Sequence, residues 1–152
     1  MDLFKRLLMI VSMLAITAFA ADKGQDYFQS KKVKKSANYK RAMQLYKEGC
    51  KNIEQGFVYD TNKCIASFDL LKKIAIKYDH VFDVHFHLGK IYVYQPQSFN
   101  WRAKPESNLQ LKELGMRHLR KALKINPNHF EAKKLYSKLD IKKASSAQAQ
   151  GL

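Results

Sequence analysis

Two stretches in the C-terminal half of the chain decide its fold. Residues 83–95 read DVHFHLGKIYVYQ, and residues 114–134 read LGMRHLRKALKINPNHFEAKK. In both, apolar residues recur at steps of three and four, which is the spacing of one face of an α-helix. Gly89 and Gly115 put a small residue in each stretch, which allows close helix packing, and Pro127 marks an end. The pattern predicts two tightly packed helices.

The same residues resemble one tetratricopeptide repeat (TPR), a helix-turn-helix unit of 34 residues. The matching positions are Leu88, Gly89, Tyr92, Gly115, Leu119, Ala122 and Pro127. Leu88 and Gly115 lie 27 positions apart, 14 more than in the family, and the extra residues fall in the turn-rich segment 95–108. Leu71 precedes Leu119 by 48 positions, which is the 34-residue period plus the same insertion. The resemblance therefore extends to an earlier, more degenerate unit.

Helical spacing continues on both sides of this unit. It predicts helices over residues 36–53, 64–78 and 81–94, a fourth starting at Ser107 and a fifth over residues 128–143. Ser36, just before the first apolar stripe, is the expected N-cap of the first helix. No segment shows a sustained period of two, so the expected class is all-α. The resemblance implies antiparallel helical hairpins of a short TPR-like solenoid over residues 36–143, with a C-terminal capping helix. Residues 144–152 show no period and are predicted to form a disordered tail.

The first 20 residues predict a secretory signal peptide. Lys5 and Arg6 precede the apolar run 7–20, which ends with small residues at Ala18 and Ala20. The run of about 14 residues is shorter than the roughly 20 that a membrane-spanning helix needs. We therefore expect cleavage after Ala20 and export to a bacterial periplasm. An uncleaved anchor is the alternative.

The chain is strongly basic, with 28 Lys and Arg against 13 Asp and Glu and a net charge of +15. Such a charge favours an anionic partner or surface. Only five of the basic residues are Arg, the side chain best suited to paired hydrogen bonds with bases and phosphates, so nucleic acid is not expected as a partner. Residues 21–35 have little apolar content and are predicted to form a flexible basic arm.

Two cysteines, Cys50 and Cys64, predict a disulfide in an exported chain. They lie at equal distances from residue 57, inside the predicted turn, so antiparallel helices would bring them to the same height. A bridge that closes a loop of this size stabilises a fold by roughly 3 kcal/mol. Because the spacing is far from that of a redox-active Cys-x-x-Cys pair, we expect a structural role.

The five histidines form no recognisable metal motif in the sequence. His85 and His87 are two positions apart on a helix and would point in different directions. We expect His85 or His118 to be a partly buried packing residue, and we expect no metal and no cofactor. The sequence also has no glycine-rich phosphate loop and no nucleophile elbow, so it yields no candidate catalytic residue and favours a binding protein over an enzyme.

The TPR resemblance implies a groove lined by the first helix of each unit. In this register the groove positions are Asp83, Phe86, Lys90, Val93 and Tyr94, continued on the last helix by Glu131, Lys134, Lys138 and Lys142. A basic and partly aromatic groove of this kind suits an acidic peptide segment of another protein. The alternative is that the lysines form only a solvated helix face.

The inserted segment offers a second contact site, because Trp101 and Arg102 are of the residue types enriched in interface hot spots. Alternatively, Trp101 covers the core. Together these patterns predict a non-catalytic, TPR-like adaptor that binds another protein in a bacterial envelope assembly such as secretion, pilus or flagellar machinery. A different hypothesis is a cationic protein that associates electrostatically with anionic envelope polymers or lipid.

Overall fold

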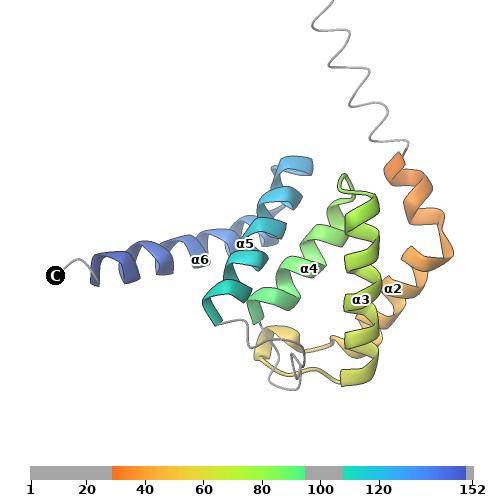
Figure 1. Ribbon diagram of the computed structural model, residues 1–152, viewed down its shortest axis with the longest axis horizontal. Helices are drawn as coiled ribbons and strands as arrows, with labels where there is room; N and C mark the ends of the chain where they lie inside the picture. The colour runs from red at the N-terminus through yellow and green to blue at the C-terminus, as the bar shows by residue number, and fades with distance from the viewer. Residues whose placement is uncertain (1–28, 95–107, 150–152) are drawn as a thin grey trace, which may run out of the picture.

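The computed structural model describes residues 29–94 and 108–149, with side chains described as far as Asp140 in the last helix. Regular structure in these ranges is entirely helical (Figure 1), which confirms the predicted all-α class. The elements are α2 (Ala37–Gly49), the short 3-10 helix η1 (Ile53–Gln55), α3 (Thr61–Lys77), α4 (Phe82–Tyr94), α5 (Asn108–Ile125) and α6 (Phe130–Ala149). None of the described helices is long and apolar enough to cross a membrane.

The first hairpin pairs α2 with α3. Ser36 caps α2, because its side chain accepts a hydrogen bond from the backbone N–H of Tyr39, as its position before the apolar stripe predicted. Beyond the turn, Asp60 caps α3 in the same way through Lys63 N–H. The predicted Cys50–Cys64 disulfide is confirmed, and it joins the two helices beside their connecting turn.

The second hairpin pairs α4 with α5, and two glycines set how closely the helices approach. A Cβ atom added to Gly89 would lie 2.8 Å from Cγ of Leu119, and one added to Gly115 would lie 2.7 Å from Cγ2 of Val93. Both distances are too short for carbon atoms in contact. The helices can therefore lie this close only because neither position carries a side chain.

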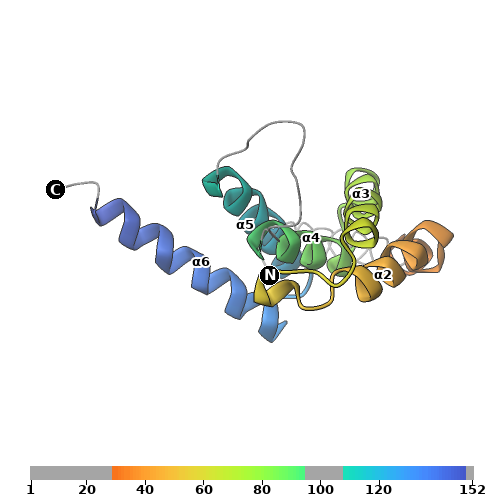
Figure 2. The same ribbon diagram turned by 90° about the horizontal axis from the view of Figure 1, so that it is seen from below.

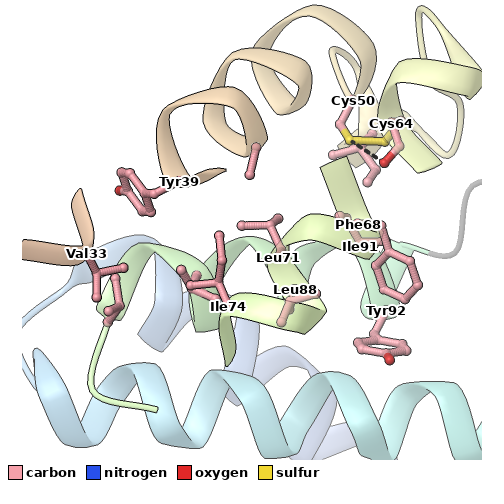
Figure 3. Packing of buried hydrophobic residues seen from close by; sticks show 14 of the residues in the cluster. Val33, Tyr39, Cys50, Cys64, Phe68, Leu71, Ile74, Leu88, Ile91 and Tyr92 are labelled. Atoms are coloured by element: carbon pink, nitrogen blue, oxygen red, sulfur yellow. Dashed lines mark hydrogen bonds between the residues drawn. A yellow bond between two sulfur atoms is a disulfide. The ribbon is translucent and has the colours of Figure 1, made fainter. Parts of the chain in front are cut away.

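Helix α4 lies between the two halves of the molecule and contributes to both hydrophobic clusters (Figures 1 and 2). In the first cluster, Leu71 of α3 and Leu88 of α4 are completely buried, and Figure 3 shows them gathered between the helices, with the disulfide nearby. In the second, Phe86 of α4 packs with Leu119 of α5 and Leu135 of α6. Full burial of each such side chain contributes about 1.5–3 kcal/mol to folding.

The predicted flexible arm is wrong for residues 29–35, which form a helical segment just before α2. Val33 is only 3% exposed and belongs to the first hydrophobic cluster. Lys34 forms an ion pair of 2.6 Å with Asp83 of α4, whose carboxylate also accepts a hydrogen bond from the Tyr39 hydroxyl. One apolar residue among lysines was enough to dock the segment. The rest of the arm, residues 21–28, lies outside the described residues.

Helix α6 continues to Ala149, six residues beyond the predicted end at Lys143. The extension runs through Ala, Ser and Gln, among which Ala and Gln favour helix, and the first breaker after Pro127 is Gly151. The predicted disordered tail over residues 144–152 is therefore corrected as far as residue 149. Figures 1 and 2 both show the C-terminal end of α6 pointing away from the other helices. The predicted signal peptide, residues 1–20, lies outside the described residues.

Candidate functional site

A cavity of about 310 Å³ lies where η1, α4 and α6 meet. We call it the α4–α6 groove, and its lining residues are Glu54, Tyr94, Glu131, Lys134, Leu135 and Lys138. Three of the residues predicted from the sequence, Tyr94, Lys134 and Lys138, meet in this groove although about 40 positions separate the first from the other two. The arrangement joins a turn, a central helix and the last helix in a single concave surface.

Lys90 was predicted to offer a positive charge to a partner, but its charge is already paired. Its ammonium group donates hydrogen bonds to Glu54 of η1 and to Glu131 of α6, the latter at 2.8 Å, and its side chain is only 11% exposed. Burial alone would lower the pKa of Lys90, yet the two carboxylates raise it above its usual value. Lys90 thus stays charged and ties three elements together, so it is not available to a partner.

Phe86 was also predicted to line the groove, and the structure places it in the core instead. It is 5% exposed, lies under Lys90 with 5.4 Å from the ammonium to the ring centre, and stacks on Phe82 with ring centres 5.6 Å apart. Helix α6 covers this side of α4, and Leu135 belongs to the same cluster. The prediction for Phe86 was wrong because it assumed that this face of α4 is open. In the structure, residues of α6 pack against that face.

Sequence patterns did not reveal the polar groups buried behind the groove. The Tyr46 hydroxyl and Nδ1 of His87 are buried and have no hydrogen-bond partner among the described residues. Their rings lie 4.1 Å apart, and burial raises the pKa of Tyr46 to about 12 and lowers that of His87 to about 4. Lys90 and Glu54 are close enough to influence the Tyr46 pKa electrostatically. Neutral polar groups therefore lie behind the charged cluster of the groove.

Lys134 and Lys138 supply the groove's unpaired positive charge. Both are exposed on α6, one turn apart, and neither forms an ion pair within the described ranges. Lys142 follows one turn later, and its side chain is not among those described. Trp101 and Arg102, the predicted second contact site, also lie outside the described residues.

A larger cavity, of about 600 Å³, opens on the other side of α4, between α3 and α5. We call it the α3–α5 cavity. None of its lining residues was predicted as a site residue, although His85 and His118, expected as packing residues, meet in it. They lie 33 positions apart on two helices, and nothing in their local sequence indicates that they pair. No group of three or more His, Cys, Asp or Glu in the described parts of the chain is placed to hold a metal ion.

The two cavities differ in how far the sequence anticipates them. The α4–α6 groove joins residues that the sequence pattern had grouped, whereas the α3–α5 cavity joins residues that it had not.

Comparison of the chain with protein-family models, with curated proteins and with solved structures gave no match.

Proposed function

We propose that this protein is a non-catalytic, TPR-like adaptor that holds a segment of another protein in the α4–α6 groove. The observation that carries the proposal is the meeting of Tyr94, Lys134 and Lys138 around one cavity. Two further features support it. Gly89 and Gly115 sit at the closest approach of α4 and α5, where the TPR pattern has small residues, and the groove lies along α4 and α6, the helices that would line the groove in such an array.

The groove suggests what the bound segment looks like. Lys134 and Lys138 present positive charge on one wall, whereas the half-buried Tyr94 presents an aromatic ring. A short segment that carries an acidic residue beside an apolar one would satisfy both. The proposal therefore predicts a partner with a mixed acidic and apolar motif, because a purely anionic surface would leave the ring of Tyr94 without a complementary contact.

The setting of the adaptor is part of the proposal and rests on the N-terminal residues. The signal-like pattern of residues 1–20 supports export to the periplasm. We therefore propose a role in an envelope assembly, such as secretion, pilus or flagellar machinery.

Photo-crosslinking in the native envelope tests the groove with a matched control. A photoreactive amino acid replaces Lys138, which lines the groove, or Lys133, which is exposed on the same helix and does not line it. We expect position 138 to capture one protein through one defined segment and position 133 not to do so. A peptide of that segment should then bind the purified chain, and Lys138→Glu should weaken binding at least about tenfold, as loss and reversal of one contacting charge imply.

The result that would contradict the adaptor is equally concrete. If both positions crosslink the same mixture of lipid or polysaccharide, and if raising the salt from about 50 to about 500 mM abolishes binding to that material, charge alone is responsible. Lys133→Glu and Lys138→Glu would then weaken binding equally. That outcome would favour the cationic, surface-associated protein over the adaptor.

A further inference from the structure

The α3–α5 cavity lies apart from the proposed groove and has its own chemistry. Helices α3 and α5 flank α4 (Figure 1), and the cavity opens between them. Its volume of about 600 Å³ is within the range of small-molecule sites. Its walls combine apolar surface from Ala75 and Ile76 with polar side chains from all three helices and from the α3–α4 turn. A ligand of this cavity would not depend on the adaptor function.

Hydrogen bonds along one wall assign the protons of the two histidines. Nε2 of His85 lies 2.9 Å from the backbone carbonyl of Asp79, which can only accept, so this nitrogen carries the proton of a neutral ring. The other nitrogen, Nδ1, is then an acceptor. Nδ1 of His118 lies 3.0 Å from it and must donate. The network therefore fixes His118 with its proton on Nδ1 and a free lone pair on Nε2.

Positive charge predominates around this lone pair. The charged or titratable residues that line the cavity are Lys72 and Lys77 from α3, Asp79 and His80 from the turn, His85 and Tyr92 from α4, and His118 and Lys121 from α5. Lys121 is paired with Asp79 at 2.7 Å, and Arg117 adds positive charge from the same helix as His118. Lys72 and Lys77 form no ion pair within the described ranges. Their ammonium groups lie over aromatic rings, 5.2 Å from the ring centre of Phe68 for Lys72 and 5.3 Å from that of Tyr78 for Lys77. No carboxylate among the described residues neutralises these two charges at the rim of the cavity.

His118 is held neutral by these surroundings. Burial, reinforced by neighbouring His85 and Lys121, lowers the pKa of His118 to about 4. Its ring stacks on Tyr92, with ring centres 5.6 Å apart and planes inclined by 9°. A ligand bound at this wall must therefore donate a hydrogen bond to Nε2 of His118 and must also offer anionic oxygens to the lysine ammonium groups.

A phosphate monoester meets both requirements. Its second pKa is about 6, so near neutral pH a sizeable fraction is the monoanion, which has one O–H donor and several anionic oxygens. A carboxylate or sulfonate has the anionic oxygens but no proton to donate at this pH. We propose that the α3–α5 cavity binds a small organic phosphate monoester, with the phosphate between Lys72 and Nε2 of His118 and the organic body against Ala75 and Ile76.

Two matched probes test the proton donor. Phenyl phosphate and benzenesulfonate share a ring and an anionic group, but only the phosphate can donate a proton. We expect phenyl phosphate, titrated into the purified chain at about pH 5, to shift the ¹⁵N resonances of the His118 ring saturably. At this pH it is mostly the monoanion and carries the same charge as benzenesulfonate. It should bind at least about tenfold more tightly than benzenesulfonate, which is the contribution of one charge-assisted hydrogen bond. Inorganic phosphate, which lacks the organic body, should bind more weakly than phenyl phosphate.

Two neighbouring lysines provide the matched variants. Lys72 lines the cavity, and Lys73 is exposed next to it on α3 without lining it. Lys72→Gln should weaken phenyl phosphate binding about fivefold, as loss of one nearby charge near the surface implies, and Lys73→Gln by less than about twofold. Both changes are at the surface, so both proteins should fold.

Several outcomes would overturn this assignment. A lack of saturable shifts at His118 with millimolar phenyl phosphate would exclude the site. Equal affinities for phosphate and sulfonate, or equal effects of the two lysine variants, would show attraction by net charge alone. Equal binding of inorganic phosphate would remove the organic body from the proposal. Lys138→Glu, in the groove, should leave phenyl phosphate binding unchanged, which separates this test from that of the adaptor.

Discussion

At the scale of single residues, charge counted along the chain differs from charge that a partner can use. The net charge of +15 suggested a broadly basic groove, yet Lys90 is bound to Glu54 and Glu131. In the groove, only Lys134 and Lys138 keep their charge unpaired within the described ranges. Pairing across sequence separations of 36 and 41 residues cannot be deduced from local composition, because it depends on which helices meet.

Gly115→Ala should destabilise the protein although alanine is the better helix former. Alanine in a helix gains about 1 kcal/mol over glycine, but the new Cβ would lie 2.7 Å from Cγ2 of Val93, a stiff β-branched side chain, and 3.2 Å from its backbone nitrogen. Overpacking of this kind costs about 1–3 kcal/mol, so we expect a net loss of up to about 2 kcal/mol in the free energy of unfolding, measured in urea. Val93→Ala should restore part of the loss in the double variant. Gly115→Ala at or above wild-type stability would contradict the close helix contact.

Stability should fall in mild acid, in part because of His87. Burial lowers the pKa of His87 in the folded protein to about 4, from 6.5 when exposed. Below pH 6.5 the His87 ring therefore binds a proton in the unfolded chain but stays neutral in the folded protein. The contribution of neutral His87 to the free energy of unfolding is therefore fully present above pH 6.5 and is lost progressively as the pH falls to about 4. The total loss is at most about 3 kcal/mol.

His87→Phe isolates this contribution, because it keeps a ring against Tyr46 but removes the titrating group. Unfolding in urea at pH 7, 5.5 and 4.5 should show a shallower loss for the variant than for the wild type, by about 1 kcal/mol per pH unit. Carboxylates titrate in both proteins and cancel in the comparison. Parallel pH profiles would show that His87 is as readily protonated in the folded protein as in the unfolded chain.

At the scale of elements, the two hairpins are held together by different means. The disulfide and a hydrogen bond of 2.9 Å from Ser67 to the Ala42 carbonyl join α2 to α3. Glycine contacts allow α4 and α5 to pack directly. The first hairpin therefore includes a covalent bond, whereas the second is held by close packing at its glycines and by the hydrogen bond between His85 and His118.

Removal of the disulfide should weaken the first hairpin most. The Cys50→Ser/Cys64→Ser double variant should lose roughly 3 kcal/mol of unfolding free energy, the value expected for a loop of this size. Hydrogen exchange should show the largest increase at the amides around the α2–α3 turn. Reduction of the wild type with dithiothreitol should have the same effect, and the double variant should not respond to the reductant. An equal increase throughout α4 and α5 would contradict a local role.

Local signals predicted the elements well, and long-range contacts were predicted poorly. Ser36 as a cap and the Cys50–Cys64 bridge follow from patterns within about 15 residues, where helical geometry fixes what meets. The burial of Val33 was not predicted, because a single apolar residue among polar ones does not form a periodic pattern. The pairing of His85 with His118 was missed because it depends on how α4 and α5 pack side by side. A cavity does lie between α4 and α6, which carry the residues predicted for the groove, but Lys90 is paired with Glu54 of η1 and with Glu131 of α6, so the sequence overstated the charge available there.

At the scale of the whole molecule, α4 links the two hydrophobic clusters. Its Leu88 belongs to the cluster with α2 and α3, and its Phe86 to the cluster with α5 and α6. The proposed binding sites lie on two sides of the same helix. A change that disturbs α4 should therefore reach both sites. The shared helix also implies that the two clusters unfold together.

Two core truncations on opposite sides of α4 test this cooperativity. Leu71→Ala affects only the first cluster and Leu119→Ala only the second, and both side chains are fully buried. Each should cost about 2–5 kcal/mol of unfolding free energy. Because α4 must be intact for either cluster to form, each variant should still unfold in one transition. Leu119→Ala should lower the hydrogen-exchange protection of α3 amides as much as that of α5 amides.

The control for these truncations is Ile76→Ala, because Ile76 is 85% exposed and its truncation should change stability by less than about 0.5 kcal/mol. If Leu119→Ala instead released only α5 and α6, while α2 and α3 kept wild-type protection, the clusters would be independent units. Binding in the groove and in the α3–α5 cavity could then be lost separately. In a cooperative molecule, by contrast, a ligand of either site stabilises the whole fold, so phenyl phosphate should raise the free energy of unfolding measured at α6 as well as at α3.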